Sequence, residues 1–473
     1  MTEEQGPVAR AQGPVAGKRA PVHKPKGQVR EGKGPVREGK GPVAEMHVRG
    51  PGPARLFRFL IYGLVLASSA AQYSVVPILP VYAHRFGLTG VQQGMVLGAT
   101  GLATLAVSVP AGALSDRFGA RRLTLWAGWL MSIALFAQAV AGSFPVLLAA
   151  RLGFGIGFAV IWTAGLSWLA EAAPGGAGLG GTVASAGAGG VVGPALSGMA
   201  VQYFGLMSPF LAVAAGFAVL TLALGLLRMR VIAPPPPARM GTSLRAATAD
   251  RRTIVAAAAI VTAGGTTGVS ALLVPAELHV AGASPGQIGL VFALGGVLFV
   301  VTSMLTTAAG HRAVRMSVVM AGMLALAFAL SPAVLASTPF AIVTMQCATT
   351  AMRSLLWTVS YPLAAAGAER SGAGIGVVMG LLNGVWAATV LLGPLAAGLA
   401  AGRLSAQAVF GLTAAACLAI LAVTVLAAGP LRRPARVACV PGGDLAEGGD
   451  LAAGGDLAAG GDQMPSRSRS GNG

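Results

Sequence analysis

The chain has 473 residues, of which 55% are hydrophobic and only 10% are charged. Soluble domains carry about one charged residue in four, so this composition excludes an ordinary soluble protein and indicates one that crosses a membrane many times. The formal net charge of +18 comes mostly from a basic N-terminal tail and from arginines in loops, without the interleaved aromatic residues that stack on bases, and we therefore expect no nucleic-acid partner.

Both ends of the chain are of low complexity. Residues 1–55 repeat Gly-Pro-Val, and residues 431–473 contain Gly-Gly-Asp-Leu-Ala repeats. Neither segment can bury enough apolar surface to offset the entropy lost on ordering, so both are predicted to be disordered tails. The polar start of the chain predicts no cleavable signal peptide, and the first apolar run should act as an uncleaved anchor.

Between the tails lie twelve apolar runs of about 20 residues, each long enough to cross a hydrocarbon core of roughly 30 Å. We expect an all-α integral membrane protein with twelve transmembrane helices in two pseudo-symmetric six-helix bundles. The bundles are predicted at residues 56–230 and 253–430, joined by a Pro- and Arg-rich loop at 231–252. The runs cover residues 57–82, 90–113, 121–141, 145–170, 178–203, 207–228, 253–277, 286–309, 314–334, 338–364, 372–399 and 405–428.

The arginines in the loops predict the orientation. With the N-terminus in the cytoplasm, the inner loops hold twelve arginines and the outer loops hold only Arg85 and Arg403. Short cytoplasmic loops are enriched in Lys and Arg, so both termini are expected on the cytoplasmic side of the cell membrane. The twelve are Arg117, Arg121, Arg122, Arg228, Arg230, Arg239, Arg245, Arg251, Arg252, Arg312, Arg315 and Arg370.

The two predicted bundles resemble each other in sequence. Pro80-x-x-x-His84-x-x-Gly87-x-Thr89-x-x-Gln92-x-Gly94 recurs 195 residues later as Pro275-x-x-x-His279-x-x-Gly282-x-Ser284-x-x-Gln287-x-Gly289, and Gly193-Pro194 recurs as Gly393-Pro394. Two homologous bundles are what an alternating-access transporter needs, because the halves rock against each other around a site near the midplane.

One charged loop interrupts the first bundle between its second and third runs. It reads Gly112-Ala-Leu-Ser-Asp116-Arg117-Phe-Gly119-Ala-Arg121-Arg122, and such charges belong at a membrane face. The pattern resembles the loop between helices 2 and 3 of the major facilitator superfamily. The resemblance implies a conformational latch formed by Gly112, Asp116, Arg117, Gly119, Arg121 and Arg122. Ala120 departs from it, because the family usually has another basic residue there.

Two further motifs resemble those of the twelve-helix drug:proton antiporters within this superfamily. The fifth run carries Gly189-x-x-x-Gly193-Pro194-x-x-x-Gly198, an exporter-type motif whose small residues let two helices approach closely. The first run carries Pro77-x-x-Pro80. The resemblance implies export of organic molecules and drug resistance.

Two arginines lie inside the apolar runs. Arg151 begins Arg-x-x-Phe154-Gly155-x-Gly157 in the fourth run, and Arg353 lies fifteen residues past Thr338 in the tenth. An unpaired arginine in a bilayer is costly, so each is predicted to face a cavity or a buried partner. Snorkelling of Arg151 to the outer surface is the alternative interpretation.

Few residues could carry a coupled proton or line the cavity. Glu277 at the end of the seventh run is the candidate proton carrier, and an interfacial carboxylate is the equally simple alternative. Apolar walls with a few aromatic and polar groups suit hydrophobic organic substrates. The cavity candidates are Gln72, Tyr73, Trp162, Trp357, Tyr361, Asn383 and Trp386.

The chain has no enzyme signature. It lacks a phosphate-binding Gly-x-x-x-x-Gly-Lys-Ser/Thr loop, and Cys347, Cys417 and Cys439 show no paired spacing and no neighbouring His. We therefore expect neither an enzyme, a metal site nor a cofactor, with the proton gradient as the energy source.

The resulting functional prediction is a monomeric, proton-coupled exporter of hydrophobic or amphipathic small molecules. Its partners would be the lipid bilayer, protons and a small-molecule substrate. The alternatives are uptake or exchange of a metabolite by the same fold and, more remotely, a non-transporting membrane sensor or scaffold.

Overall fold

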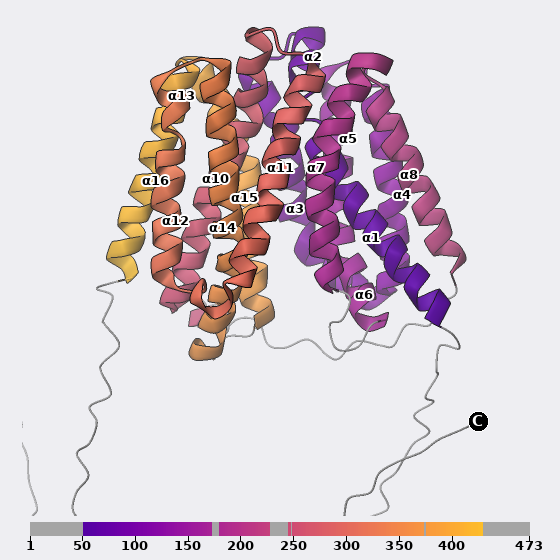
Figure 1. Ribbon diagram of the computed structural model, residues 1–473. Coiled ribbons are helices and arrows are strands. Elements are labelled where there is room, and N and C mark those ends of the chain that lie inside the picture. Colours follow the sequence, from indigo (N-terminus) through magenta and orange to yellow (C-terminus); the bar gives the residue numbers. More distant parts are fainter. Residues whose placement is uncertain (1–50, 173–178, 228–244, 247, 373–374, 429–473) are drawn as a thin grey trace, which may run out of the picture. The chain divides into compact units, whose positions relative to one another are not determined.

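The computed structural model describes residues 51–172, 179–227, 245–246, 248–372 and 375–428, and these residues form helices and short connections with no β-strand. The predicted tails, except for residues 51–55, lie outside the described residues, as does most of the predicted loop at 231–252. Figure 1 shows long helices running side by side.

The helices follow the predicted apolar runs. The N-terminal set, called the N-half below, comprises α1 (Pro51–Ser74), α2 (Leu79–Phe86), α3 (Gly90–Phe118), α4 (Ala120–Ala139), α5 (Phe144–Val160), the π-helical turn η1 (Ile161–Gly165), α6 (Leu166–Ala172), α7 (Leu179–Phe204) and α8 (Ser208–Leu226). The C-terminal set, the C-half, comprises α10 (Arg251–Val280), α11 (Pro285–Ala308), the 3₁₀ turn η2 (Gly310–Arg312), α12 (Met316–Ala329), α13 (Ser331–Leu335), α14 (Pro339–Ser371), α15 (Ile375–Ala401) and α16 (Ala406–Ala428).

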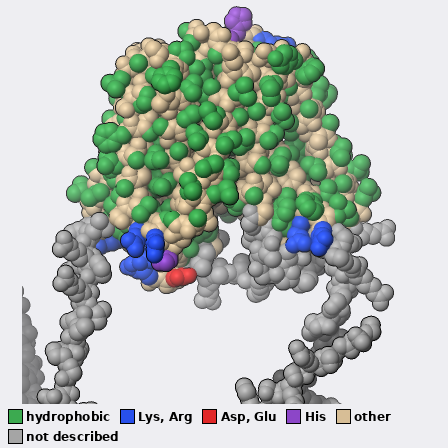
Figure 2. Space-filling view, in the orientation of Figure 1, with side chains coloured by type: hydrophobic (Ala, Val, Ile, Leu, Met, Phe, Trp, Pro, Cys, Tyr) green, Lys and Arg blue, Asp and Glu red, His purple; other side chains and the backbone are tan. Residues whose placement is uncertain are grey.

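The helices are long and apolar enough for an integral membrane protein. Among the described residues, ten helical stretches meet the length and hydropathy expected of a membrane span. The predicted runs 121–141 and 338–364 are helical as α4 and α14 but are not among these ten. Figure 2 shows a flank of hydrophobic and uncharged side chains, with the charged side chains of that view at its two edges. This pattern fits an apolar belt in lipid between two wet faces.

The first predicted run is broken rather than continuous. Helix α1 ends at Ser74, and α2 begins at Leu79 after a turn that contains Pro77. Proline cannot donate a backbone hydrogen bond, and its ring clashes with the preceding turn. The carbonyl of Ser74 instead accepts a hydrogen bond from Ser197 Oγ of α7 at 2.9 Å. A neighbouring helix thus satisfies the backbone group that the break leaves free.

The two halves meet along two contacts that we call the seams. In one seam α3 packs on α15, and in the other α11 packs on α7, side by side in the middle of Figure 1. Both seams place glycines directly against backbone of the opposite helix. The first seam contains three such contacts: Gly90 with Gly398, Gly94 with Pro394, and Gly101 with Ala387 and Leu391. Their counterparts in the second seam are Pro285 with Gly198, Gly289 with Pro194, and Gly296 with Gly190 and Val191.

The seams repeat the sequence duplication in three dimensions. The α3 and α11 positions of these pairs differ by 195 residues, and most of the α15 and α7 positions differ by 200, which are the two offsets found in the sequence. The helices that begin the seams also start alike. Thr89 with Gln92, and Ser284 with Gln287, form complete capping boxes at the N-termini of α3 and α11.

Each seam closes only one end of the molecule. Beyond Gly101, α3 exposes Leu105 and Val109, and α11 exposes Val301 and Met304 beyond Gly296. On α15, Gly380 and other glycines before Gly393 have open space around them. The two halves therefore separate toward the end that carries the α3–α4 loop, and Figure 2 shows a hollow in the middle of that edge.

Adding a single methyl group at a seam glycine is predicted to lower the stability of the protein. A Cβ on Gly94 or Gly289 would lie inside van der Waals contact with the carbonyl oxygen of Pro394 or Pro194. We expect Gly94→Ala and Gly289→Ala each to cost about 1–3 kcal/mol through overpacking. The thermal unfolding midpoint of the purified protein in detergent should fall.

Gly380→Ala is the matched control, because a Cβ there meets nothing within 4 Å. A glycine-to-alanine change in an open helical position gains about 0.5–1 kcal/mol, so its unfolding midpoint should stay level or rise. Equal behaviour of the three variants would contradict the close backbone contact at the seams.

Candidate functional site

Arg151 is held inside the N-half. It lies on α5, is fully buried, and donates from Nε to the carbonyl of Val96 at 3.2 Å and from Nη2 to Thr100 Oγ1 at 3.1 Å, both on α3. Nη2 also contacts Gln72 Oε1 of α1 at 3.4 Å, and the guanidinium lies over the Phe154 ring at 5.0 Å. Arg151 therefore ties α1, α3 and α5 together and does not snorkel to a surface.

The close approach of α5 to α3 makes this bonding possible. Gly155, one turn after Arg151, lies so near Thr100 and Ala103 that a Cβ would overlap both. One guanidinium nitrogen, Arg151 Nη1, has no partner among the described residues although it is buried. Within the described residues no carboxylate forms a salt bridge with Arg151. Its positive charge is instead compensated by neutral oxygens of α1 and α3 that accept its hydrogen bonds.

Arg353 lies in the middle of α14 and is 7% exposed. Its Nη2 donates to Thr350 Oγ1, one turn earlier on the same helix. Thr350 in turn lies against Gly295 of α11. Within the described part of the chain, Arg353 thus has a single hydrogen-bond partner, on its own helix, whereas Arg151 has partners on two other helices.

An aromatic cluster joins the two halves next to Arg353. Trp386 of α15 lies 6.1 Å from Trp357 of α14 and 6.4 Å from Phe158 of α5, measured between ring centroids. Trp357 also contacts Tyr361 at 5.3 Å, and Phe158 contacts Trp162 at 5.8 Å. Three of the predicted cavity residues, Trp357, Tyr361 and Trp386, thus come together in the C-half. Phe158, which is not among the predicted cavity residues, connects them to Trp162.

The polar cavity candidates lie around this cluster. Tyr361 Oη donates to Asn383 Oδ1 at 3.0 Å, and the Asn383 side chain is exposed. Tyr73, at the end of α1, is 37% exposed and lies near Arg353 of the opposite half. Gln72 is bonded to Arg151 instead.

Trp162 lies in an irregular part of its helix. The turn Ile161–Gly165 is π-helical, with one extra residue relative to the α-helices α5 and α6 on either side. Such bulges redirect side chains and are frequent at functional sites. The indole Nε1 of Trp162 is buried and has no hydrogen-bond partner among the described residues.

The exporter-type motif on α7 contacts two neighbours. Gly189 and Gly193 face α1, where a Cβ on either would overlap the carbonyl of Leu66 or Ala70. Pro194 and Gly198 face α11 of the C-half, at the seam. The motif therefore packs α7 against the broken first helix on one side and against the opposite half on the other.

The predicted latch has one well-bonded member. Arg121 Nη2 donates to the carbonyls of Gly225 at 2.7 Å and Leu227 at 3.3 Å, at the C-terminus of α8. A cation there satisfies free carbonyls and complements the helix dipole. Arg117 and Arg122 are exposed, and Gly119 joins α3 to α4 with a φ of 87°. Gly112 is half-buried in α3, and the side chain of Asp116 lies outside the described residues.

Glu277 is half-buried in the last turns of α10, close to the helix end at Val280. Its place matches both interpretations of the sequence, a proton carrier and an interfacial carboxylate. Pro77 and Pro80 are buried in and after the break between α1 and α2.

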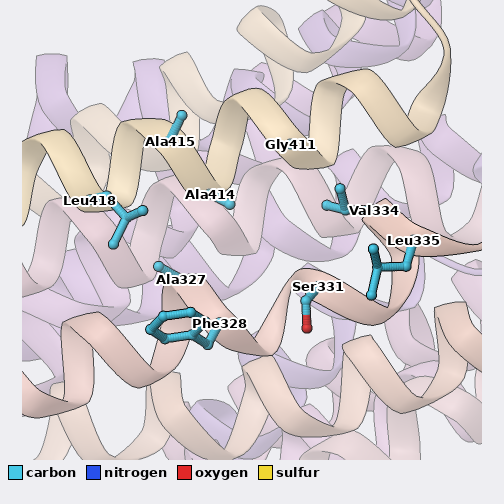
Figure 3. A pocket seen from close by; sticks show the side chains of 9 residues that line it. All are labelled: Ala327, Phe328, Ser331, Val334, Leu335, Gly411, Ala414, Ala415 and Leu418. Carbon is cyan, nitrogen blue, oxygen red and sulfur yellow. The ribbon is translucent and has the colours of Figure 1, made fainter.

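An apolar groove of about 330 Å³ lies elsewhere, between α12–α13 and α16 (Figure 3). It has no titratable group, and Ser331 is the one polar side chain among its nine lining residues. It offers a ligand no charge and little hydrogen bonding, so the cluster around Arg353 is the better candidate site. The lining residues are Ala327, Phe328, Ser331, Val334, Leu335, Gly411, Ala414, Ala415 and Leu418.

Comparison with known proteins identifies the family. Residues 61–255 match the profile of the Major Facilitator Superfamily. Solved structures with this fold align over most of the chain. Residues 61–255 belong to the major facilitator superfamily. This is a family of membrane transporters and not of enzymes, and the resemblance to this superfamily noted in the sequence is confirmed.

Solved relatives share the fold of this superfamily member at low sequence identity. A bacterial homologue of the lysosomal transporter Spinster, described as inward-facing and unoccupied, aligns with a TM-score of 0.63 at 14% identity, over 80% of this chain and 97% of its own. The POT family transporter PepTSo aligns with a TM-score of 0.64 at 13% identity, over 79% and 97% of the two chains. The nucleoside transporter NupG gives 0.62 at 14%, over 78% and 99%.

Curated relatives match this superfamily member over short stretches. The quinolone resistance protein NorA of Staphylococcus aureus is 30% identical over 100 residues, which is 21% of this chain and 26% of NorA. The uncharacterized transporter YuxJ of Bacillus subtilis is 31% identical over 155 residues, or 31% of this chain and 39% of YuxJ. The matched stretch thus spans about a quarter of the length of NorA.

The Arg151 site gives a first prediction about stability. Thr100→Val should cost about 1–3 kcal/mol, because it removes an acceptor from a buried guanidinium that already has one unbonded nitrogen. Thr104→Val is the control, since among the described residues the Thr104 hydroxyl bonds to a carbonyl of its own helix and not to Arg151. The two variants are compared by thermal unfolding in detergent, and equal midpoints would contradict the role given to Thr100.

The neighbouring arginines of the α3–α4 loop give a second matched pair. Arg121→Gln should lower stability by about 1.5–3 kcal/mol, because it removes a charged hydrogen-bond donor from the end of α8. Arg122→Gln alters the same net charge at an exposed position and should change stability by less than about 0.5 kcal/mol. Thermal unfolding again reports the difference, and a larger loss for Arg122→Gln would show that the α8 contact is unimportant.

Proposed function

We propose that the chain is a twelve-span secondary transporter whose two six-helix bundles, residues 56–230 and 253–430, move a small molecule by alternating access. Helices α4 and α14 complete the twelve spans in this proposal. The supporting observation is the geometry of the seams, which close the molecule at one end while the halves separate at the other. A rocking transporter needs such an arrangement around a central site.

The proposed orientation places the α3–α4 loop in the cytoplasm, with both chain termini. It rests on the excess of arginines in the loops of that side. The structure would then be open to the inside, like the Spinster homologue described as inward-facing. The site is the aromatic cluster with Arg353, because helices of both halves meet there.

We further propose that the direction is export, driven by the proton gradient. The α7 motif that packs on α1 and the similarity to the drug resistance protein NorA support this direction. The walls of the site are aromatic, which suits hydrophobic or amphipathic organic molecules. Glu277 is the proposed proton carrier, because it is half-buried and lies at the closed end of α10.

The test is accumulation of cationic, neutral and anionic aromatic dyes in cells with and without the protein. We expect lower accumulation of at least one dye class in expressing cells, and a protonophore should abolish the difference. Asp116→Asn should reduce export if the loop acts as a latch. Persistent export after collapse of the gradient would contradict proton coupling, and higher accumulation in expressing cells would establish uptake instead.

A matched pair of carboxylate variants tests the coupling residue. Glu277→Gln should lose gradient-dependent export, because an amide cannot exchange a proton. Glu369→Gln, an exposed position near the end of α14, should retain it. Both variants are compared at equal amounts of protein in the membrane. Export by Glu277→Gln at the parental rate would assign the proton to another group.

A further inference from the structure

The charge balance of the site points to the class of molecule that it binds. Arg353, Trp357 and Tyr361 follow one another at four-residue intervals on α14. Residues four apart lie on the same face of a helix. One face of α14 therefore presents a guanidinium followed by two aromatic rings, with Asn383 hydrogen-bonded to the last.

This face of α14 looks toward the N-half. Trp386 of α15 contacts both Trp357 and Phe158 of α5, and Tyr73 of α1 lies near Arg353. Tyr73 and Asn383 are exposed, so the surroundings of the guanidinium are accessible. A molecule entering between the halves would meet Arg353 and the rings together.

The site contains a positive charge without a matching negative one. The five acids between residues 59 and 431 all lie close to helix ends rather than in the middle of the spans: Asp116, Glu171, Asp250, Glu277 and Glu369. Within the described part of the chain, no carboxylate forms a salt bridge with Arg353. A guanidinium held in the middle of a membrane-spanning helix is unfavourable unless an anion or hydrogen-bond acceptors compensate it.

The second buried arginine does not compete for this role. Arg151 is fully buried and bonded to Val96 and Thr100 of α3 and to Gln72 of α1. Among the described residues, Thr350 is the one hydrogen-bond partner of the Arg353 guanidinium, and it lies on the same helix. The difference leaves Arg353 free to bind a ligand, whereas Arg151 serves the packing of the N-half.

We propose that the transported molecule is an aromatic organic anion, whose carboxylate or sulfonate pairs with Arg353 while its ring packs among Trp357, Trp386 and Phe158. The planar guanidinium donates two parallel hydrogen bonds to such a group. The rings add offset or edge-to-face contacts. An organic cation would meet the positive charge of Arg353 with no carboxylate to bind. This inference rests on the transport function proposed above.

Three ligands with the same ring system test it: 1-naphthalenesulfonate, 1-naphthalenemethanol and 1-naphthylmethylammonium. Their binding to the purified full-length protein in lipid nanodiscs is measured by titration calorimetry. We expect the sulfonate to bind at least about tenfold more tightly than the ammonium, with the neutral alcohol between them. Arg353→Gln should weaken sulfonate binding about tenfold and leave alcohol binding within about twofold.

Two variants control for charge and folding. Arg312→Gln removes one positive charge at an exposed position of η2 and should leave all three affinities unchanged. Arg353→Lys keeps the charge but lacks the planar pair of donors, so sulfonate affinity should lie between those of the parent and Arg353→Gln. Retained alcohol binding shows that each variant is folded.

The outcomes distinguish a failure of the anion assignment from a failure of the transporter proposal. If the cation binds and is exported as well as the anion, and Arg353→Gln changes neither, the anion assignment is overturned while the transporter proposal stands. If dye accumulation shows transport in neither direction, the transporter proposal fails and the inference fails with it. A selective loss of sulfonate binding in Arg353→Gln supports the assignment.

Discussion

Direct contact between helix backbones holds the two halves together. At the seams, the carbonyl oxygens of Pro394 and Pro194 lie where a side chain of Gly94 or Gly289 would otherwise be. In lipid there is little hydrophobic drive for helices to associate, so association depends on close packing of small residues. The absence of side chains at these positions is therefore what allows α3 to meet α15 and α11 to meet α7.

The seams also determine where polar groups can lie. The seams occupy only the first part of α3 and α11, and the helices diverge beyond Gly101 and Gly296. The aromatic cluster with Arg353 lies where helices of the two halves are still in contact. A charge in a bilayer costs at least about 3 kcal/mol unless it is compensated. Arg151 meets this cost with oxygens of α1 and α3, and Arg353 meets it incompletely, with one threonine. This unequal compensation is the reason for proposing Arg353, and not Arg151, as the group that binds the substrate.

Much of this arrangement can be predicted from the sequence, because it depends on local residue patterns and on the internal repeat. The apolar runs predicted the helices, and the 195- and 200-residue offsets anticipated the equivalence of the seams. The pattern Thr89-x-x-Gln92 also indicates the start of α3, since a Ser or Thr followed three residues later by Gln is typical of a capping box. Pro77 similarly signalled the break after Ser74.

Tertiary contacts could not be read in the same way. Phe158 is one of many apolar residues in its run, and only the approach of α15 brings it against Trp386. The partners of Arg121 are backbone carbonyls about a hundred residues away, which no side-chain pattern marks. The same holds for Ser197, whose bond to the carbonyl of Ser74 depends on how closely α7 meets α1. Such contacts follow from packing, which the order of residues along one helix does not reveal.

The central claim is that the seams open when the opposite end closes, and distances between spin labels test it most directly. One pair joins Phe204 and Val280 at the seam end, and the other joins Leu226 and Leu426 at the opposite end; all four side chains are exposed. On addition of an exported dye in a lipid membrane, the account predicts that the first distance lengthens while the second shortens. Distances that stay fixed, or that change in the same direction, would contradict it.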